Sequence, residues 1–301
     1  MGFHASMQTE VLPSAGSPHR AILSTTLSVP PFLTGVGISD TGTHPGVNQD
    51  AFRMADLSGS SSRPRALFAI ADGMGGLPHG RFASNLALQL FFESFVREAR
   101  TRTEPALRRS MEEAHFGMQQ AMQQLGIAAM GTTLTAACAD GSRVDLVHIG
   151  DSRAYLIRDG RAVCLTHDHS TAGELVRMRI IAPDKVRGHA RRSELTRGLG
   201  LGLFIQPEIH RVEVFSGDRL VLCTDGVWSV IEDPELAEAA GPGNPPLEGG
   251  RTLVDQAMKR GSEDNVSAVV IAWDGLPAAA KEPRGLAAQF WDRLRGRADR
   301  I

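Results

Sequence analysis

Two short apolar runs, each followed by an aspartate and a glycine, constrain the fold of this chain most strongly. The first, Ala66–Ala71, leads into Asp72-Gly73, and the second, Leu220–Cys223, leads through Thr224 into Asp225-Gly226. A continuous apolar run of this length that ends in a turn is typical of a buried strand. We therefore expect two strands that each carry one carboxylate to their C-terminal end.

Three more aspartates lie in glycine or asparagine turns, namely Asp50, Asp151 and Asp264. Each alone is typical of an ordinary turn residue. If the strands lie side by side, however, their carboxylates meet at the edge of the core, where burial and like-charge repulsion cost free energy. A divalent cation would offset both costs, and an all-oxygen ligand set suits Mg²⁺ or Mn²⁺. The sequence contains no His/Cys cluster with the spacing of a zinc site.

The glycines after Asp72 fit the same interpretation. Gly73 would let its own carbonyl approach a cation, and Gly75-Gly76 would keep the approach open. An alternative interpretation takes Gly73-Met74-Gly75 as part of a dinucleotide-binding turn. That motif needs a third glycine where Pro78 stands, and no second strand ends in an acid about 20 residues further on, so we disfavour it.

The remaining pattern is that of a mixed α and β domain. Helices are expected after Gly80, from about Thr103, at Ala172–Met178 and at Arg251–Lys259, whereas Gly241–Gly250 is expected to be a loop. Short β-branched and apolar runs predict further strands. These are Thr132–Cys138, Arg143–Ile149, Arg153–Arg158, Arg161–Leu165, Ile209–Val214, Arg219–Thr224 and Val266–Trp273.

The sequence predicts one domain over residues 26–275, between two tails. Residues 1–25 lack periodicity and are expected to be a mobile tail. Residues 168–198 are polar and arginine-rich, which indicates a surface insertion. The basic tail 276–301 repeats Leu286, Phe290 and Leu294 every fourth residue. It would form either a short amphipathic helix that touches a partner or membrane surface, or a helix docked on this domain.

Composition excludes several classes of protein. The net charge is −2, from 32 basic and 34 acidic residues, which argues against a nucleic-acid binder. Cys138, Cys164 and Cys223 show no paired spacing, so we expect free thiols in a reducing compartment. No apolar run approaches the roughly 18 residues of a transmembrane helix, and no secretory signal is visible. We therefore expect a cytoplasmic protein without a transmembrane segment.

Eight motifs in register resemble the metal-dependent protein phosphatase family, the type 2C serine/threonine phosphatases, and in particular its bacterial members. They span about Gly35 to Ile271. They are VNQDAF (47–52), FAIADGMGG (68–76), GTTLTAA (131–137), HIGDSRAYLIRDG (148–160), LTHDHS (165–170), LTRGLG (195–200), LVLCTDGVWSVIED (220–233) and EDNVSAVVI (263–271).

The resemblance implies an α+β fold in which two stacked antiparallel sheets are flanked by helices, an α-β-β-α sandwich. It implies two metal ions, Mn²⁺ or Mg²⁺, bridged by Asp72. Gly73 would bind one ion through its carbonyl, and the insertion 168–198 would be the family's flap. The other implied ligands are Asp50, Asp225 and Asp264, with Asp151 and Asp225 at a weaker third site.

The implied activity is the hydrolysis of phosphoserine and phosphothreonine in proteins. Two cations that share a water lower its pKa, so that hydroxide becomes available near neutral pH and attacks phosphorus in line. Phosphorylated proteins would be the partners, among them a serine/threonine kinase or its substrates. A non-catalytic phosphate- or metal-binding regulatory module on the same fold is the alternative.

The chain departs from the family pattern at two positions. Members commonly carry an arginine just before the NQD motif that helps to hold the phosphate, whereas His44 and Pro45 stand here. His44 or an arginine from elsewhere would take that role. Some members place a histidine proton donor where this chain has Met74. The general acid would then be His44, His148 or a metal-bound water.

Overall fold

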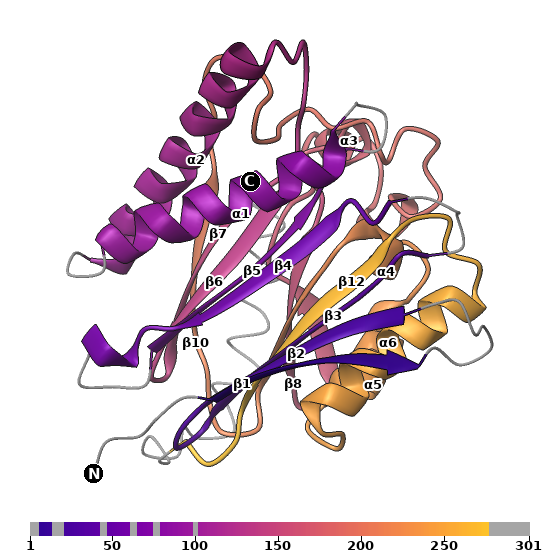
Figure 1. Ribbon diagram of the computed structural model, residues 1–301. Coiled ribbons are helices and arrows are strands. Elements are labelled where there is room, and N and C mark those ends of the chain that lie inside the picture. The colour runs from indigo at the N-terminus through magenta and orange to yellow at the C-terminus, as the bar shows by residue number, and fades with distance from the viewer. Residues whose placement is uncertain are drawn as a thin grey trace.

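The computed structural model of this protein describes residues 6–13, 21–42, 47–60, 65–74, 79–98 and 102–276. Two antiparallel sheets lie face to face, with a helical layer on the outer side of each (Figure 1). This arrangement confirms the predicted α-β-β-α sandwich.

The first sheet has seven described strands and the second has five. In spatial order the first contains β1 (Ser6–Pro13), β2 (Ala21–Val29), β3 (Leu33–Asp40), β12 (Val266–Trp273), β11 (Arg219–Cys223), β8 (Arg153–Arg158) and β9 (Arg161–Cys164). The second contains β10 (Glu208–Glu213), β7 (Arg143–Ile149), β6 (Leu134–Asp140), β5 (Arg65–Asp72) and β4 (Asp50–Asp56).

The helices form the two outer layers. Against the five-stranded sheet lie α1 (Gly80–Arg97) and α2 (Thr103–Leu125), and against the seven-stranded sheet lie α4 (Asp225–Trp228), α5 (Asp233–Ala240) and α6 (Pro246–Lys259) (Figure 1). The row Ala83, Ala87, Phe91 and Phe95 of α1 is fully buried. The methionine-bearing face of α2 belongs to the same core cluster, so these methionines are packing residues.

The N-terminal prediction was wrong in part, because β1 and the first residues of β2 lie within segment 1–25, which we expected to be a mobile tail. β2 pairs with β3 from Leu23 to Val29, and the β2 side chains of Ile22, Leu27 and Val29 are buried. The serines and threonines between these apolar residues obscure the period-two pattern of a strand in the sequence. The segment is recognised as a strand only from its pairing with β3.

Helix α6 begins at Pro246, inside the expected loop Gly241–Gly250. Proline suits the first helical position because its φ is already helical and its missing N–H has no partner there. Gly250 lies against Ile38 and Gly249 lies against the backbone of α5, so these glycines permit close packing within a helix.

The arginine-rich insertion lies between β9 and β10 and contains α3 (Thr171–Arg177) and the 3-10 turn η2 (Pro183–Lys185). The hydroxyl of Ser170 caps α3 by accepting a hydrogen bond from Gly173 N at 3.2 Å. The predicted helix Ala172–Met178 is therefore present with bounds shifted by one residue.

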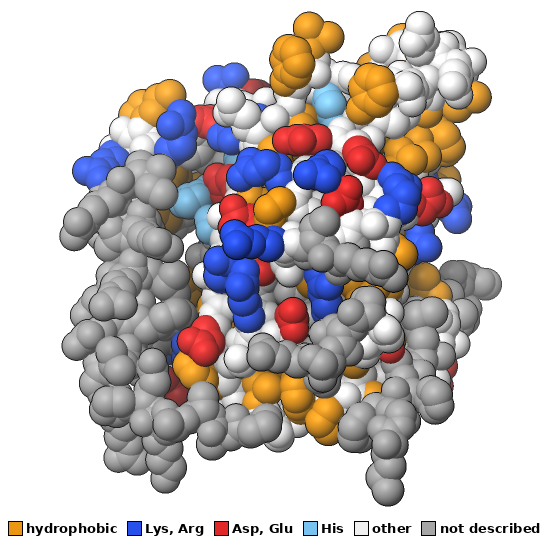
Figure 2. Space-filling view, turned by 90° about the vertical axis from the view of Figure 1, so that its left-hand side faces the viewer, with side chains coloured by type: hydrophobic (Ala, Val, Ile, Leu, Met, Phe, Trp, Pro, Cys, Tyr) orange, Lys and Arg blue, Asp and Glu red, His pale blue; other side chains and the backbone are white. Residues whose placement is uncertain are grey.

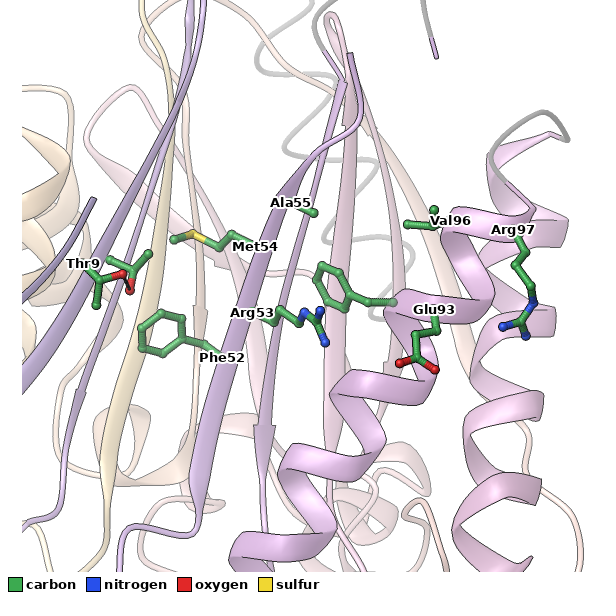
Figure 3. A pocket seen from close by; sticks show the side chains of 10 residues that line it. Thr9, Phe52, Arg53, Met54, Ala55, Glu93, Val96 and Arg97 are labelled. Carbon is green, nitrogen blue, oxygen red and sulfur yellow. Dashed lines mark hydrogen bonds between the residues drawn. The ribbon is translucent and has the colours of Figure 1, made fainter. Parts of the chain in front are cut away.

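A groove lies beside β4, the edge strand of the five-stranded sheet. Figure 3 shows Phe52 and Met54 pointing to one side of β4, while Arg53 points to the other side, toward α1. The guanidinium of Arg53 lies 5.2 Å from the centre of the Phe92 ring. The alternation follows from the period of two along a strand.

The surface has mixed charge. On the face in Figure 2, acidic and basic side chains are interspersed, in keeping with the small net charge. No described helix is both long enough and apolar enough to cross a membrane. The tail 277–301, with its expected amphipathic helix, lies outside the described residues.

Candidate metal centre

Asp50 and Asp72 are paired directly across two neighbouring strands. Asp50 is the first residue of β4, and its partner Asp72 is the last residue of β5. Side chains in such a pair project from the same face of the sheet. Burial, and then the charges of Asp264 and Asp225, raise the pKa of Asp50 to about 7. Burial and the charge of Asp50 raise the pKa of Asp72 well above its usual value.

The other sheet brings Asp225 and Asp264 to the same place. Asp225 follows β11 and Asp264 precedes β12, and these two strands are antiparallel neighbours. Asp225 is buried and Asp264 is exposed. Burial and the charge of Asp264 raise the pKa of Asp225 to about 7, and the positive charge of Arg192 opposes this rise.

Thr224 joins the two sheets at this point. Its hydroxyl donates a hydrogen bond of 2.8 Å to Oδ2 of Asp50, which lies 174 residues away in the chain. Asn265 makes a second link, because its Oδ1 accepts a hydrogen bond of 2.8 Å from Gln49 N. The carboxylates therefore sit where the ends of both sheets are tied together by side chains.

The backbone around Asp72 and Gly73 is held in place. Asp72 N donates to the hydroxyl of Thr133 at 2.9 Å, and Thr133 N donates to Asp72 O at 2.9 Å. Gly73 N donates to Gln49 O at 3.1 Å. A Cβ at Gly73 would overlap the carbonyl oxygen of Gly80 at the start of α1. Glycine is required here because the helix approaches so closely.

Asp151 lies beside this group. It is buried, and burial followed by the charge of Asp225 raises its pKa well above the usual value. Its backbone carbonyl accepts a hydrogen bond of 2.9 Å from Nε1 of Trp228 in α4. The structure thus brings all five predicted aspartates within electrostatic range of one another.

The residues present fit a hard divalent cation. Oδ1 of Asp50 and Oδ1 of Asp225 are buried and have no hydrogen-bond partner among the described residues. Such orphaned oxygens are costly unless a ligand satisfies them. The buried side-chain donors of Asp50, Asp151 and Asp225 are carboxylate oxygens, which favour Mg²⁺ or Mn²⁺. His44 and Gly75-Gly76 lie outside the described residues.

His148 is unsuited to the role of general acid that the sequence left open for it. Its Nε2 lies 3.0 Å from the carbonyl of His167 and its Nδ1 lies 2.8 Å from the Thr135 hydroxyl. Burial and then the nearby His169 lower its pKa to about 3. A neutral imidazole with both nitrogens engaged is a structural group.

Sequence reasoning missed three contributors. Thr133 and Thr224 lie within the motifs at 131–137 and 220–233, and this position was the available signal. Arg192 has no comparable signal, because it lies in the irregular insertion. His167, Glu208 and His210 form a group whose ligand atoms lie within 4.8 Å of one another, although no zinc-like spacing was visible in the sequence.

Comparison with known proteins supports the assignment by resemblance. The Protein phosphatase 2C family matches residues 44–249. Serine/threonine protein phosphatase PstP of Mycobacterium tuberculosis is 34% identical over 214 residues, which cover 68% of this chain and 40% of PstP. The match thus spans less than half of PstP. Serine/threonine phosphatase stp of Listeria monocytogenes is 30% identical, and the match covers 68% of this chain and 83% of stp.

A solved structure agrees with the fold. The crystal structure of the catalytic domain of PstP in complex with two manganese ions aligns with a TM-score of 0.68 and 30% identity. The alignment covers 81% of this chain and 99% of that domain. The paired sheets, the order of the motifs and the family match agree, and the chain belongs to the protein phosphatase 2C family of metal-dependent phosphatases.

Proposed function

We propose that this chain hydrolyses phosphoserine and phosphothreonine in proteins with the help of two divalent cations. The observation that carries the proposal is the pair of buried, unpartnered oxygens, Oδ1 of Asp50 and Oδ1 of Asp225, beside Asp72. The names of the bacterial relatives and the two manganese ions in the PstP structure support it.

In this proposal each aspartate has a role. Asp72 bridges the two ions and Gly73 contributes its carbonyl, while Asp50, Asp225 and Asp264 complete the set. Asp151 and Asp225 hold a weaker third ion. When bound, such cations lower the pKa of a water toward neutrality and offset negative charge on the phosphoryl oxygens. Neither a cysteine nor a serine is needed as a nucleophile.

The chain's own residues fix this ligand set before a substrate arrives. Thr224 holds one oxygen of Asp50 and leaves the other free for a ligand. Thr133 fixes the backbone on both sides of the Asp72 side chain. Such hydrogen bonds reduce the reorganisation required when ions and phosphate bind.

We also propose that Arg192 holds the substrate phosphate. The guanidinium acts electrostatically on Asp225, and its Nε is buried without a hydrogen-bond partner among the described residues. Arginine is suited to phosphate because its planar donors match the phosphate oxygens. Arg192 would supply, from the insertion, the arginine that is missing before the NQD motif.

His44 remains a proposed residue for proton transfer or phosphate holding. The partners remain proposals as well: phosphorylated proteins, including a serine/threonine kinase or its substrates. A cytoplasmic location also remains a prediction.

The test is phosphate release from a phosphothreonine peptide by the purified chain with Mn²⁺, with Mg²⁺ and with a chelator. We expect release that depends on metal and that stops when the chelator is added. Release that continues in chelator would contradict the metal mechanism. No release with either metal would favour the alternative, a non-catalytic phosphate- or metal-binding module.

A further inference from the structure

A second group of possible metal ligands lies at the base of the arginine-rich insertion. His167 lies just after β9, where the chain enters the insertion, and Glu208 and His210 lie on β10, where the chain has left it. Glu208 and His210 are two residues apart on a strand, so they project from the same face. These three residues therefore bring together the chain segments before and after the insertion.

The spacing of the atoms matches that of a transition-metal site. Nδ1 of His167 lies 3.3 Å from Oε2 of Glu208, and Nε2 of His210 lies 3.1 Å from the same oxygen. The three ligand atoms all lie within 4.8 Å of one another. Zinc bonds of about 2.0–2.1 Å in a tetrahedral site place ligand atoms about 3.3–3.4 Å apart. Small side-chain adjustments would therefore suffice.

A surrounding layer of hydrogen bonds orients these ligands. Gly150 N donates to Nδ1 of His169 at 3.1 Å, so the proton of the neutral ring lies on Nε2. That Nε2 is buried without a well-aligned hydrogen bond among the described residues, and it lies 3.2 Å from Oε1, the second oxygen of the Glu208 carboxylate. The ring of His148 holds the backbone carbonyl of His167 at 3.0 Å. Such secondary contacts are characteristic of metal sites, where they fix the direction of the ligands.

The direction of the contacts also suits a cation. Nδ1 of His167 and Nε2 of His210 both approach the same oxygen of Glu208, at 3.3 Å and 3.1 Å. A metal ion would replace the protons that these two rings now direct at one oxygen.

From the geometry we infer that His167, Glu208 and His210 bind one transition-metal ion of the zinc class. Two imidazoles and one carboxylate suit Zn²⁺, whereas the aspartate centre offers only oxygen ligands. The side chains of His167 and His210 are 41% and 29% exposed, so an ion can enter and water can supply the fourth ligand. The bound ion would link the start of the insertion, at His167, to strand β10.

The inference does not depend on phosphatase activity, and its test does not use it. The metal-free full chain, with Mg²⁺ in excess to occupy oxygen-only sites, is titrated with Zn²⁺ by calorimetry and with Co²⁺ by visible absorption. Four-coordinate Co²⁺ with imidazole ligands absorbs much more strongly than six-coordinate Co²⁺ with oxygen ligands.

The variants are His167→Gln, His210→Gln and the double variant, because glutamine can still donate to Glu208 but is a poor metal ligand. His189→Gln, within the insertion, is the matched control. We expect the wild type and the control to bind one more Zn²⁺ per chain than the double variant and to give the intense Co²⁺ bands. Each single variant should bind at least about 10-fold more weakly.

Equal zinc stoichiometry and equal Co²⁺ spectra in the wild type and a folded double variant would overturn the inference. X-ray absorption of wild-type protein with less than one equivalent of Zn²⁺ gives a second readout that needs no variant. Imidazole scattering from about two histidines would support the site, and a shell of oxygens alone would overturn it.

Discussion

Asp50 and Asp72 face each other across the β4–β5 ladder at the ends of their strands. Two carboxylates in this position repel each other, and burial increases the cost of ionising either one. If cations bind between these carboxylates, as we propose, they would relieve this repulsion, and the free energy gained would contribute to metal affinity.

Replacing a central carboxylate should remove both metal binding and turnover. We expect Asp72→Ala and Asp225→Ala to abolish phosphate release and to weaken Mn²⁺ binding in calorimetry. Asp184→Ala is the control, since Asp184 is exposed and pairs only with the neighbouring Lys185 among the described residues. Full activity in either central variant would remove that residue from the proposed ligand set.

Asp50 and Asp225 should each lower the stability of the metal-free protein as pH rises from about 4 to about 7. The pKa of Asp50 and that of Asp225 are about 7 in the folded chain, against 3.8 as the ordinary value. Over this range the folded state holds protons that the unfolded state has released, so the free energy of unfolding falls with rising pH.

The lowered pKa of buried His148 has the opposite effect and makes the free energy of unfolding rise with pH. A variant is therefore needed to isolate the contribution of Asp50. In chelator, Asp50→Asn should become increasingly more stable than wild type between about pH 4 and pH 7. In saturating Mn²⁺ the wild type should instead be the more stable of the two proteins. Urea unfolding at several pH values measures the stability of each protein with and without Mn²⁺. A difference in chelator that stays constant between about pH 4 and pH 7 would contradict the raised pKa of Asp50 as the cause.

Removing the hydroxyl of Thr224 should weaken metal binding without unfolding the chain. Thr224→Val deletes the donor to Asp50 Oδ2 while it keeps the shape of the side chain. We expect about 10- to 100-fold weaker Mn²⁺ binding, the usual effect of losing a group that orients a ligand. Thr25→Val on β2 is the control, because its hydroxyl bonds only an exposed Thr9 among the described residues.

Replacing Arg192 should weaken substrate binding more than metal binding. Arg192→Ala should lower kcat/KM by about 10- to 100-fold, equivalent to one charged hydrogen bond of about 1.5–3 kcal/mol, mainly through KM. Mn²⁺ affinity should change little. The neighbouring Arg191, whose guanidinium pairs with Glu194, provides the matched control Arg191→Ala.

His44→Ala should be measured beside these arginine variants. If His44 acts in proton transfer or phosphate holding, a loss of roughly 10- to 100-fold is expected. Unchanged kinetics in His44→Ala together with a raised KM in Arg192→Ala would assign phosphate holding to the insertion. The opposite pattern would assign it to the segment before the NQD motif.

Gly73 should tolerate no side chain. Gly73→Ala places a methyl group on the carbonyl of Gly80, so either α1 or the Asp72 turn must move. We expect a loss of about 1–3 kcal/mol in stability, the usual cost of overpacking, together with a loss of metal binding. A Cβ at Gly59 meets no atom within 4 Å, so Gly59→Ala should leave thermal unfolding and activity unchanged.

The sequence by itself determined the local chemistry of this protein. The apolar run before Asp72 and the one before Asp225 predict buried strands that end in carboxylates, because continuous apolar residues require burial and glycine permits the turn that follows. The order of the motifs then indicated the family. Local patterns are sufficient for such conclusions because each depends on residues that are close in the chain.

Only the tertiary structure decided which distant residues meet. Thr224 donates a hydrogen bond to Asp50, which lies 174 residues away in the chain. Arg192 lies in an irregular segment and interacts electrostatically with Asp225. The cluster of His167, Glu208 and His210 forms because the chain leaves β9 and returns at β10. Strand pairing and loop closure bring these groups together, and neither leaves a periodic trace in the sequence.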